Sequence, residues 1–261
     1  MEIFEVELFG REGWQVDRWS TESVFHGFLG AQLDVRNSLE SLAKVVCESA
    51  HDRLRALRFL ELEQIHSTDI INFDPSCVEH YSRPRGDAWL VDFSRLGPGP
   101  VAFAIRTADC LPVLIRCRNA GRFFGALHCG WRGCLAGLLP KALEHLLRNR
   151  VRAEEIELAV GPGARSCCFE IETELAEKFL STWGSTLRGK QIMELSNNII
   201  HCDLPQLLRA QAVSLGVAED HIAESKLCTI CDPRFFSYRR EKAASGRQLS
   251  FIGSVLVNNN S

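Results

Sequence analysis

Three apolar segments of the sequence each bring a potential metal ligand to a turn. His66 lies in LEQIHSTDI, Cys110 in IRTADCLPVLI and His128 in FFGALHCGWRG. Side chains at strand ends can converge on one pocket, and two imidazoles with one thiolate suit a tetrahedral zinc site with an open fourth position. The separations of 44 residues (66 to 110) and 18 residues (110 to 128) match no local zinc-ribbon pattern. A buried thiol and core histidines therefore remain an alternative interpretation of the same residues.

Arginines near these segments could bind an anion. Arg132 in GWRG follows His128 at the predicted start of a helix, where a guanidinium and backbone N–H groups would hold a phosphate. Arg239 and Arg247, in FFSYRREKAASGRQLS, have aromatic neighbours, a combination that suits a phosphate together with a planar base. We expect Arg132 to be the main phosphate ligand, with Arg247 and Arg239 assisting. For Arg240, a solvated surface side chain is an equally good interpretation.

Asp109 directly precedes Cys110, and its residue type is compatible with two roles. Its carboxylate could transfer a proton during catalysis. It could equally fix the turn through hydrogen bonds to nearby backbone groups.

The remaining cysteines lie outside the candidate metal site. An odd count of eleven, in a chain without a secretion signal, favours reduced thiols over a disulfide framework. Cys167 and Cys168 are interpreted as packing residues at the start of a helix. The CxxC pair Cys228 and Cys231 permits a redox role, but no second CxxC motif accompanies it.

The elements that must position these residues alternate in type. Apolar or alternating runs predict strands at 2–9, 57–65, 101–107, 112–117, 122–128, 156–161 and 248–257. Helical spacing predicts helices at 38–50, 132–149, 172–183 and 204–215, and Pro140 is expected to kink or interrupt the second of these. Because no strict strand–helix–strand rhythm is present, we expect an α+β fold of mixed β-sheets flanked by helices, in a single domain spanning 1–261.

Composition argues against several classes of protein. The net charge of −3 provides no basic field for nucleic acid or for an anionic membrane. The N-terminus lacks the features of a signal peptide, and the most apolar stretch, VAFAIRTADCLPVLIRC, is interrupted by charged residues. We therefore expect a cytoplasmic protein that binds neither nucleic acid nor membrane.

Seven motifs occur in the order typical of the YfiH family, which the chain resembles from about residue 20 to its end. They are QIHS, TADCLPVL, HCGWRG, GPGARSCCFE, the DL of HCDLPQL, LCT, and FFSYRR with GRQLS. Members of this family were once called laccase-domain or multicopper polyphenol oxidases and are now described as purine nucleoside phosphorylases. The resemblance implies mixed β-sheets and helices related to the catalytic domain of cytotoxic necrotizing factor. It also implies that His66, Cys110 and His128 bind zinc.

The resemblance further implies an activity on purine nucleosides and phosphate. It predicts phosphorolysis of adenosine, inosine, guanosine and methylthioadenosine to base plus ribose 1-phosphate, and deamination of adenosine. Two departures from the family pattern stand out. Cys129 replaces an alanine beside a ligand, which makes copper loading in vitro a hazard. Arg165 is unusual in its motif, where it could add an anion contact or face solvent.

Two other activities compete with this prediction. An amidase that edits peptidoglycan precursors, a role attributed to some bacterial relatives, would use the same zinc. A copper polyphenol oxidase needs many histidines, often in HxH pairs, whereas this chain has eight histidines and no such pair.

Overall fold

The computed structural model describes most of the chain. The described residues are 1–17, 19, 24–36, 54, 57–74, 83–97, 99–118 and 123–256. The predicted helix at 38–50 and the final residues 257–261 lie outside them. Within the described ranges, no helix is long and apolar enough to cross a membrane.

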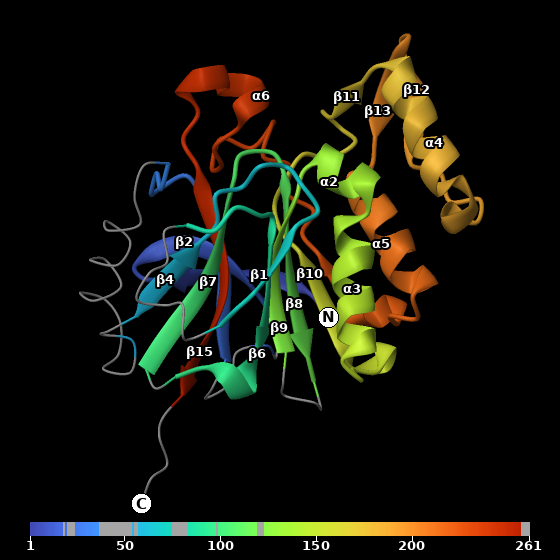
Figure 1. Cartoon of the computed structure of the whole chain (residues 1–261). Helices are drawn as coiled ribbons and strands as arrows, with labels where there is room; N and C mark the ends of the chain where they lie inside the picture. Colours follow the sequence, from blue (N-terminus) through green and yellow to red (C-terminus); the bar gives the residue numbers. More distant parts are fainter. Residues whose placement is uncertain are drawn as a thin grey trace, which may run out of the picture.

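Two six-stranded sheets form the centre of the fold (Figure 1). The first has the strand order β1-β2-β3-β15-β7-β4 and the second β14-β10-β8-β9-β6-β5. Both are mixed, because β4 runs parallel to β7, β5 to β6 and β14 to β10, while the other neighbours are antiparallel. The strands of the first sheet are β1 (Ile3–Leu8), β2 (Arg11–Val16), β3 (Val24–Leu29), β4 (Arg58–Glu61), β7 (Gly99–Thr107) and β15 (Gln248–Leu256). Those of the second are β5 (Ile70–Asn72), β6 (Ala88–Asp92), β8 (Leu111–Cys117), β9 (Phe123–Cys129), β10 (Ile156–Val160) and β14 (Ile222–Glu224).

The two sheets pack face to face around large apolar side chains. In β7, Val101 and Phe103 belong to the core shared with the second sheet, whereas Ala102 and Ala104 belong to a cluster on the opposite face. This division follows from the alternation of side chains along a strand. Phe103 meets Trp89 of β6 nearly edge-on, with ring centroids 5.2 Å apart, and both side chains are fully buried.

Helices cover the outer face of the second sheet (Figure 1). The long helices are α3 (Leu138–Arg148), α4 (Thr173–Leu187) and α5 (Leu204–Ser214), and the short α2 (Trp131–Ala136) precedes α3. In α3, Leu139, Leu143 and Leu146 are buried, and their helical spacing forms one apolar stripe against the sheet. The predicted helices at 172–183 and 204–215 correspond to α4 and α5.

The predicted helix at 132–149 is interrupted at Gly137, not at Pro140. Gly137 adopts a φ of 79°, in the left-handed region that glycine enters without cost, and α2 ends there. Because α3 begins at Leu138, Pro140 lies in its first turn, where the missing N–H removes no helical hydrogen bond. The proline therefore leaves α3 intact.

Smaller elements complete the fold, and the smallest sheet and the last helix lie together at one end of the two large sheets (Figure 1). A third sheet contains β11 (Glu170–Ile171), β12 (Met193–Ser196) and β13 (Ile199–Cys202). The short helix α6 (Tyr238–Glu241) precedes β15, and single 3-10 turns occur at Phe93–Arg95, Ala153–Glu155, Glu219–His221 and Lys242–Ala244. The structure thus confirms an α+β fold of mixed sheets with flanking helices. It differs from the prediction at 57–65, where β4 ends at Glu61 and a loop follows.

Candidate metal centre

The three predicted metal ligands come from two connections and the end of one strand. His66 lies in the loop between β4 and β5, Cys110 in the turn between β7 and β8, and His128 near the end of β9. Since β7 belongs to the first sheet and β8 to the second, the turn with Cys110 crosses from one sheet to the other. Sheet packing therefore brings together residues that are far apart in sequence.

His66, Cys110 and His128 form one compact group of donors. Their potential ligand atoms all lie within 4.8 Å of one another, and Cys110 Sγ is 4.0 Å from His66 Nε2. The two imidazole rings are inclined at 73°, with centroids 4.8 Å apart. His66 is exposed, Cys110 half-buried and His128 buried, so the group is accessible from the His66 side. This donor set fits zinc with three protein ligands.

Asp87, which the sequence did not single out, organises two of these ligands. Its fully buried carboxylate accepts a 2.8 Å hydrogen bond from His128 Nδ1, which directs His128 Nε2 toward the donor group. It also accepts hydrogen bonds from the backbone N–H groups of Ile65, His66 and Ser67. These contacts hold His66 at a φ of 59°, a conformation that costs energy outside glycine. The signal in the sequence was an aspartate just before a buried strand, in a segment interpreted only as a turn.

The charges of this cluster favour a thiolate at Cys110. Burial opposes ionisation of Cys110, but the neighbouring His128 and His66 lower its pKa to about 6. Burial also opposes protonation of His128, yet Cys110 and Asp87 raise its pKa to about 9. Although desolvation acts against the Asp87 carboxylate, hydrogen bonds from His128 and Ser67 lower its pKa to about 2. Metal binding requires the Cys110 thiolate and a neutral His128, so it would release the His128 proton.

Gly130 leaves the space that the donor group occupies. A Cβ atom at this position would lie 2.9 Å from Cys110 Sγ and 3.1 Å from His66 Cδ2. Real Cβ atoms essentially never approach other atoms to less than 3.0 Å. The glycine between β9 and α2 is therefore a steric requirement of the site.

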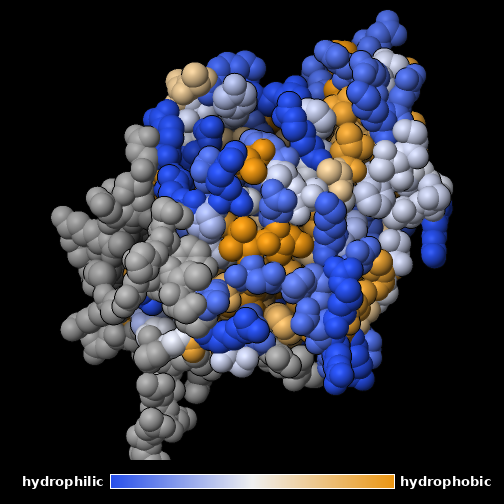
Figure 2. Space-filling view, in the orientation of Figure 1, coloured by the Kyte–Doolittle hydropathy of each residue, from blue (hydrophilic) through white to orange (hydrophobic). Residues whose placement is uncertain are grey.

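The donor group lies in a cavity of about 610 Å³ with a strongly basic wall. The arginines that line it are Arg36, Arg83, Arg106, Arg132, Arg239 and Arg247. The acidic residues that line it are Glu63 and Asp109. Hydrophilic side chains gather over this end of the molecule, between α6 and the segment that carries β11 to β13 (Figure 2). Arg36, Arg83 and Arg106 form ion pairs with Asp34 and Glu61. The positive charge that could attract an anionic ligand therefore comes from Arg132, Arg239 and Arg247.

Among the three predicted phosphate ligands, Arg132 keeps the most donor capacity. Its guanidinium lies 4.2 Å from the ring centroid of Trp131, and no described residue accepts a hydrogen bond from it. Arg239 donates to a backbone carbonyl at 3.0 Å and Arg247 to another at 2.7 Å, which orients both side chains. The helix that follows Gly130 has only six residues, so the side chain of Arg132 is the better anchor for an anion.

Asp109 accepts hydrogen bonds from two distant segments of the chain beside the cavity. Its Oδ1 accepts a hydrogen bond from Thr229 Oγ1 at 2.9 Å, and its Oδ2 accepts one from the backbone N–H of Arg239 at 2.7 Å. Neither contact is to the backbone of its own turn, because both partners lie more than 100 residues along the chain. Proton transfer by Asp109 stays a prediction. Arg240 also has a structural position, since it donates to three backbone carbonyls, including that of Thr229 at 2.8 Å.

Both departures from the family pattern are buried away from the donor group. Cys129 is fully buried in the core on the helical side of the sheet and is not part of the donor group. Arg165 is also buried and forms an ion pair with Glu224 at 2.9 Å. It therefore neither faces solvent nor lines the metal cavity, contrary to both suggestions from the sequence.

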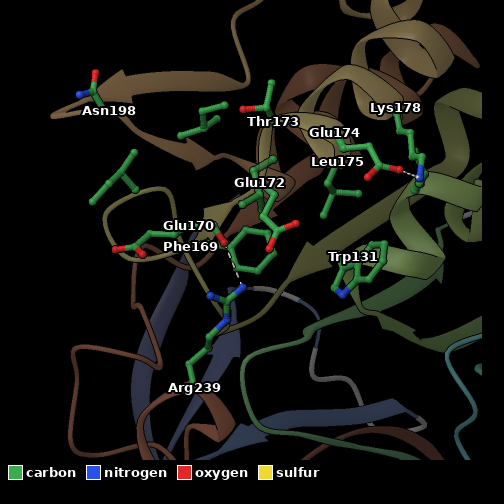
Figure 3. A pocket seen from close by; sticks show the side chains of 14 residues that line it. Trp131, Phe169, Glu170, Glu172, Thr173, Glu174, Leu175, Lys178, Asn198 and Arg239 are labelled. Carbon is green, nitrogen blue, oxygen red and sulfur yellow. Dashed lines mark hydrogen bonds and ion pairs between the residues drawn. The ribbon is translucent and has the colours of Figure 1, made fainter.

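A wider groove of about 920 Å³ adjoins the metal cavity and shares Trp131, Phe169 and Arg239 with it. Figure 3 shows Phe169 and Trp131 along one side of this groove, with Arg239 beneath Phe169. The guanidinium carbon of Arg239 lies 5.1 Å from the Phe169 ring centroid. These aromatic faces offer a stacking surface for a planar group near the metal position.

A known family model matches this sequence, and curated relatives of known name are similar to it. A family model described as "Multi-copper polyphenol oxidoreductase laccase" matches residues 31–255. The purine nucleoside phosphorylase YfiH of Escherichia coli (strain K12) is 34% identical over 192 residues, which cover 73% of this chain and 72% of the relative. Adenosine deaminase RL5, from an unknown prokaryotic organism, is 31% identical over 153 residues, or 58% of each chain.

A solved structure matches the fold over nearly its whole length. The crystal structure of YlmD from Geobacillus stearothermophilus has a TM-score of 0.77 to this structure at 24% sequence identity. The match covers 98% of this chain and all of the other. This similarity confirms the architecture of mixed sheets and flanking helices as that of a known fold.

Proposed function

Because the chain belongs to the multi-copper polyphenol oxidoreductase laccase family, which it shares with named purine nucleoside phosphorylases, we propose that it is a zinc-dependent purine nucleoside enzyme. The proposed reactions are phosphorolysis of adenosine, inosine, guanosine and methylthioadenosine, and deamination of adenosine. One observation carries the proposal: an accessible group of three metal ligands lies in a cavity lined by arginines. The first feature suits activation of a nucleophile and the second suits binding of phosphate.

The donor set supports zinc over copper. His66, Cys110 and His128 would hold the ion, and Asp87 would fix the ring orientation of His128. In the described part of the chain, groups able to hold a metal contain only these two histidines, fewer than a multicopper centre requires. Bound zinc supplies a Lewis acid that can activate water or polarise a substrate.

The residues of the chain itself divide into an anion-binding group and an aromatic surface. Arg132 binds phosphate through its unused N–H donors, and Arg247 and Arg239 add positive charge to the same cavity. The negative charge of the phosphate held there stabilises the transition state of phosphorolysis, in which the sugar carbon becomes cationic as phosphate approaches. Trp131 and Phe169 offer their ring faces to the purine base.

Product analysis tests the proposal. Zinc-loaded protein is incubated with adenosine, with and without phosphate, and the products are separated by chromatography. We expect adenine only with phosphate, and inosine in its absence, with both lost in His66→Ala. Arg132→Gln should reduce the phosphate-dependent product at least tenfold, since a ligand of the phosphate is lost. The matched control is Arg148→Gln, an exposed arginine at the end of α3 that does not line the cavity.

Two results of this assay would contradict the proposal. If adenosine, inosine, guanosine and methylthioadenosine all remain unchanged with zinc bound, the purine proposal is wrong. The amide of a peptidoglycan precursor then becomes the substrate to test, because the same zinc site would serve its hydrolysis. If turnover persists undiminished in His66→Ala, the reaction takes place elsewhere on the molecule.

A further inference from the structure

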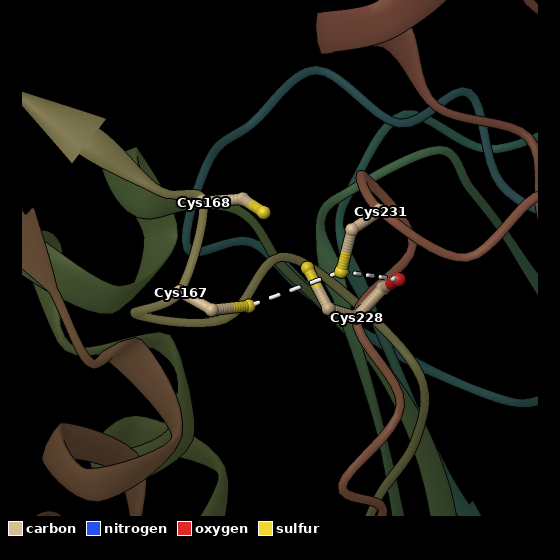
Figure 4. Close-up of side chains that lie close together, drawn as sticks. All are labelled: Cys167, Cys168, Cys228 and Cys231. Carbon is tan, nitrogen blue, oxygen red and sulfur yellow. Dashed lines mark hydrogen bonds between the residues drawn. The ribbon is translucent and has the colours of Figure 1, made fainter.

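Four cysteines from two distant loops converge beside the metal cavity. Cys167 and Cys168 lie in the loop between β10 and β11, and Cys228 and Cys231 lie in the loop after β14. Figure 4 shows their sulfur atoms turned toward a common centre from these two loops. The sequence alone predicts that the first pair packs at a helix start and that the second is a lone CxxC motif. In the structure, residues 161–169 form a loop rather than a helix start.

The spacing of the sulfur atoms suits a single metal ion. All four Sγ atoms lie within 4.8 Å of one another, and Cys167 Sγ is 4.0 Å from Cys231 Sγ. In a tetrahedral zinc site with Zn–S bonds of about 2.3 Å, adjacent sulfur atoms are about 3.8 Å apart. Only a small inward movement would therefore bring the four thiols to the geometry of a ZnCys₄ site.

We propose that Cys167, Cys168, Cys228 and Cys231 bind a second zinc ion, which is structural and separate from the His66–Cys110–His128 site. Zinc would replace the thiol protons, which are released to solvent as four Zn–S bonds form. Four sulfur ligands complete a tetrahedron and leave no open position, as in structural zinc sites. Cys228 is buried whereas Cys167 and Cys231 are exposed, so the ion has a route of entry from solvent.

The turn that contains Cys228 and Cys231 supports this assignment as well. The backbone N–H of Asp232 donates to the Cys228 carbonyl at 3.0 Å, and Cys231 Sγ donates to the same carbonyl at 3.9 Å. The turn therefore keeps Cys231 beside Cys228. Packing alone would explain the buried Cys228, but it gives no reason for two exposed thiols to join the same cluster.

The site would act as a cross-link between two loops that shape the metal cavity. The first loop leads directly from Cys168 to Phe169, which lines the cavity. The second contains Thr229, whose hydroxyl donates to Asp109 and whose backbone N–H donates to Gly163 of the first loop at 3.1 Å. Loss of the second zinc is therefore expected to loosen the cavity wall without removing any ligand of the first zinc.

Metal stoichiometry of the whole protein tests the proposal. Protein purified with reductant and zinc, and freed of excess metal, should contain about two zinc ions per chain by elemental analysis. His66→Ala should retain about one, and so should the double variant Cys228→Ser/Cys231→Ser. Cys117→Ser, at a buried cysteine of β8 outside both groups, is the matched control and should retain about two.

Cobalt provides a readout that does not depend on activity. In His66→Ala, Co²⁺ should give the intense sulfur-to-metal absorption of a tetrahedral site with several thiolates, and this absorption should be absent from His66→Ala/Cys228→Ser/Cys231→Ser. If a cysteine variant does not fold, Co²⁺ titration of His66→Ala still decides the question. Failure of the purine assay with two zinc ions bound would affect the proposed function alone.

Two results would overturn the second site. One is reduced His66→Ala protein that folds but binds neither zinc nor cobalt. The other is a Cys167–Cys231 disulfide that persists under reductant, detected as a cross-linked peptide, because a disulfide removes two of the four ligands.

Discussion

At the scale of single residues, the metal site depends on side chains that do not themselves bind metal. Asp87 fixes His128 through one oxygen and orders the loop of His66 through both. A carboxylate behind a metal-binding histidine sets its tautomer and its direction. The sequence shows the ligands because their residue types bind metal, whereas it shows Asp87 only as one polar residue in a turn.

The first prediction concerns Asp87→Asn. The amide lacks the negative charge and cannot accept at both positions, so His128 and the loop of His66 should lose their fixed orientation. We expect zinc affinity at this site to fall about 10- to 100-fold, measured by competition with a chelator. Asp220→Asn, at an exposed position, serves as the control. Equal affinities in the two variants would show that Asp87 does not position the ligands.

The second prediction concerns Gly130→Ala. The new methyl group would overlap Cys110 Sγ and crowd His66, so the variant should fold but lose zinc from this site. Circular dichroism and elemental analysis measure the two effects. Gly184→Ala is the control, because a Cβ there meets no atom within 4 Å and should stabilise α4 by up to about 1 kcal/mol. Full zinc retention in Gly130→Ala would refute the steric argument.

At the scale of elements, the candidate metal ligands lie at or just beyond strand ends, and the paired strands fix their positions. Two of the candidate ligands lie in the connections after β4 and β7, and the third lies in β9 near its end. All three strands are paired with neighbours in their sheets. Fixed strand ends limit how far a loop can move, which preorganises the donor group. The break between α2 and α3 at Gly137 shows the same dependence on local backbone, because it lets the chain turn directly after the site.

The third prediction concerns His26, which joins β2 and β3. Its Nε2 accepts a hydrogen bond from the backbone N–H of Val16 at 2.9 Å, and the side chain is fully buried. Burial, together with the positive charge of Arg116, lowers its pKa from 6.5 to about 3. The unfolded chain therefore binds this proton first as the pH falls. The stability contributed by neutral His26 is present above pH 6.5 and is lost as the pH falls toward 3.

Denaturant unfolding at pH 7 and pH 5 measures this effect. From His26 alone, the free energy of unfolding should be about 2 kcal/mol lower at pH 5 than at pH 7. His26→Gln keeps an acceptor for Val16 but cannot titrate, so its pH dependence should be smaller by this amount. An identical change in both proteins would mean that His26 is accessible to protons in the folded state.

At the scale of the whole molecule, the candidate metal site at His66, Cys110 and His128 lies where two sheets share one core. Its candidate ligands come from segments of both sheets. The site therefore forms only when the two sheets have packed together. The bound ion should therefore stabilise the folded state and have little affinity for the unfolded chain.

The fourth prediction is that zinc removal lowers the melting temperature. With free zinc 100-fold above its dissociation constant, a single site contributes about 2.7 kcal/mol to folding. Calorimetry of chelator-treated and zinc-loaded protein should show a clear difference between them. The zinc-dependent difference should be smaller in His66→Ala. A melting temperature independent of zinc would contradict metal binding by the folded protein.

The sequence by itself determined the fold class, most of the long elements and the three candidate ligands. The core strands are long apolar runs because they are buried on both faces, and the helices show the 3.6-residue period because they are buried on one. Ligand types could be recognised because imidazole and thiolate are the groups that bind zinc. The expected activity and metal came from the resemblance to a family. The spacing of the ligands along the sequence matches no local zinc pattern and could not have indicated either.

Only the tertiary structure decided which residues meet. Asp87 reaches His128, and Cys167 and Cys168 reach the pair at Cys228 and Cys231, across separations that no local pattern records. Arg165 and Arg240 looked available for a ligand but are used by ion pairs and backbone contacts within the fold. The physical reason is that propensity and periodicity act over a few residues, whereas a site is made by the packing of loops from different sheets.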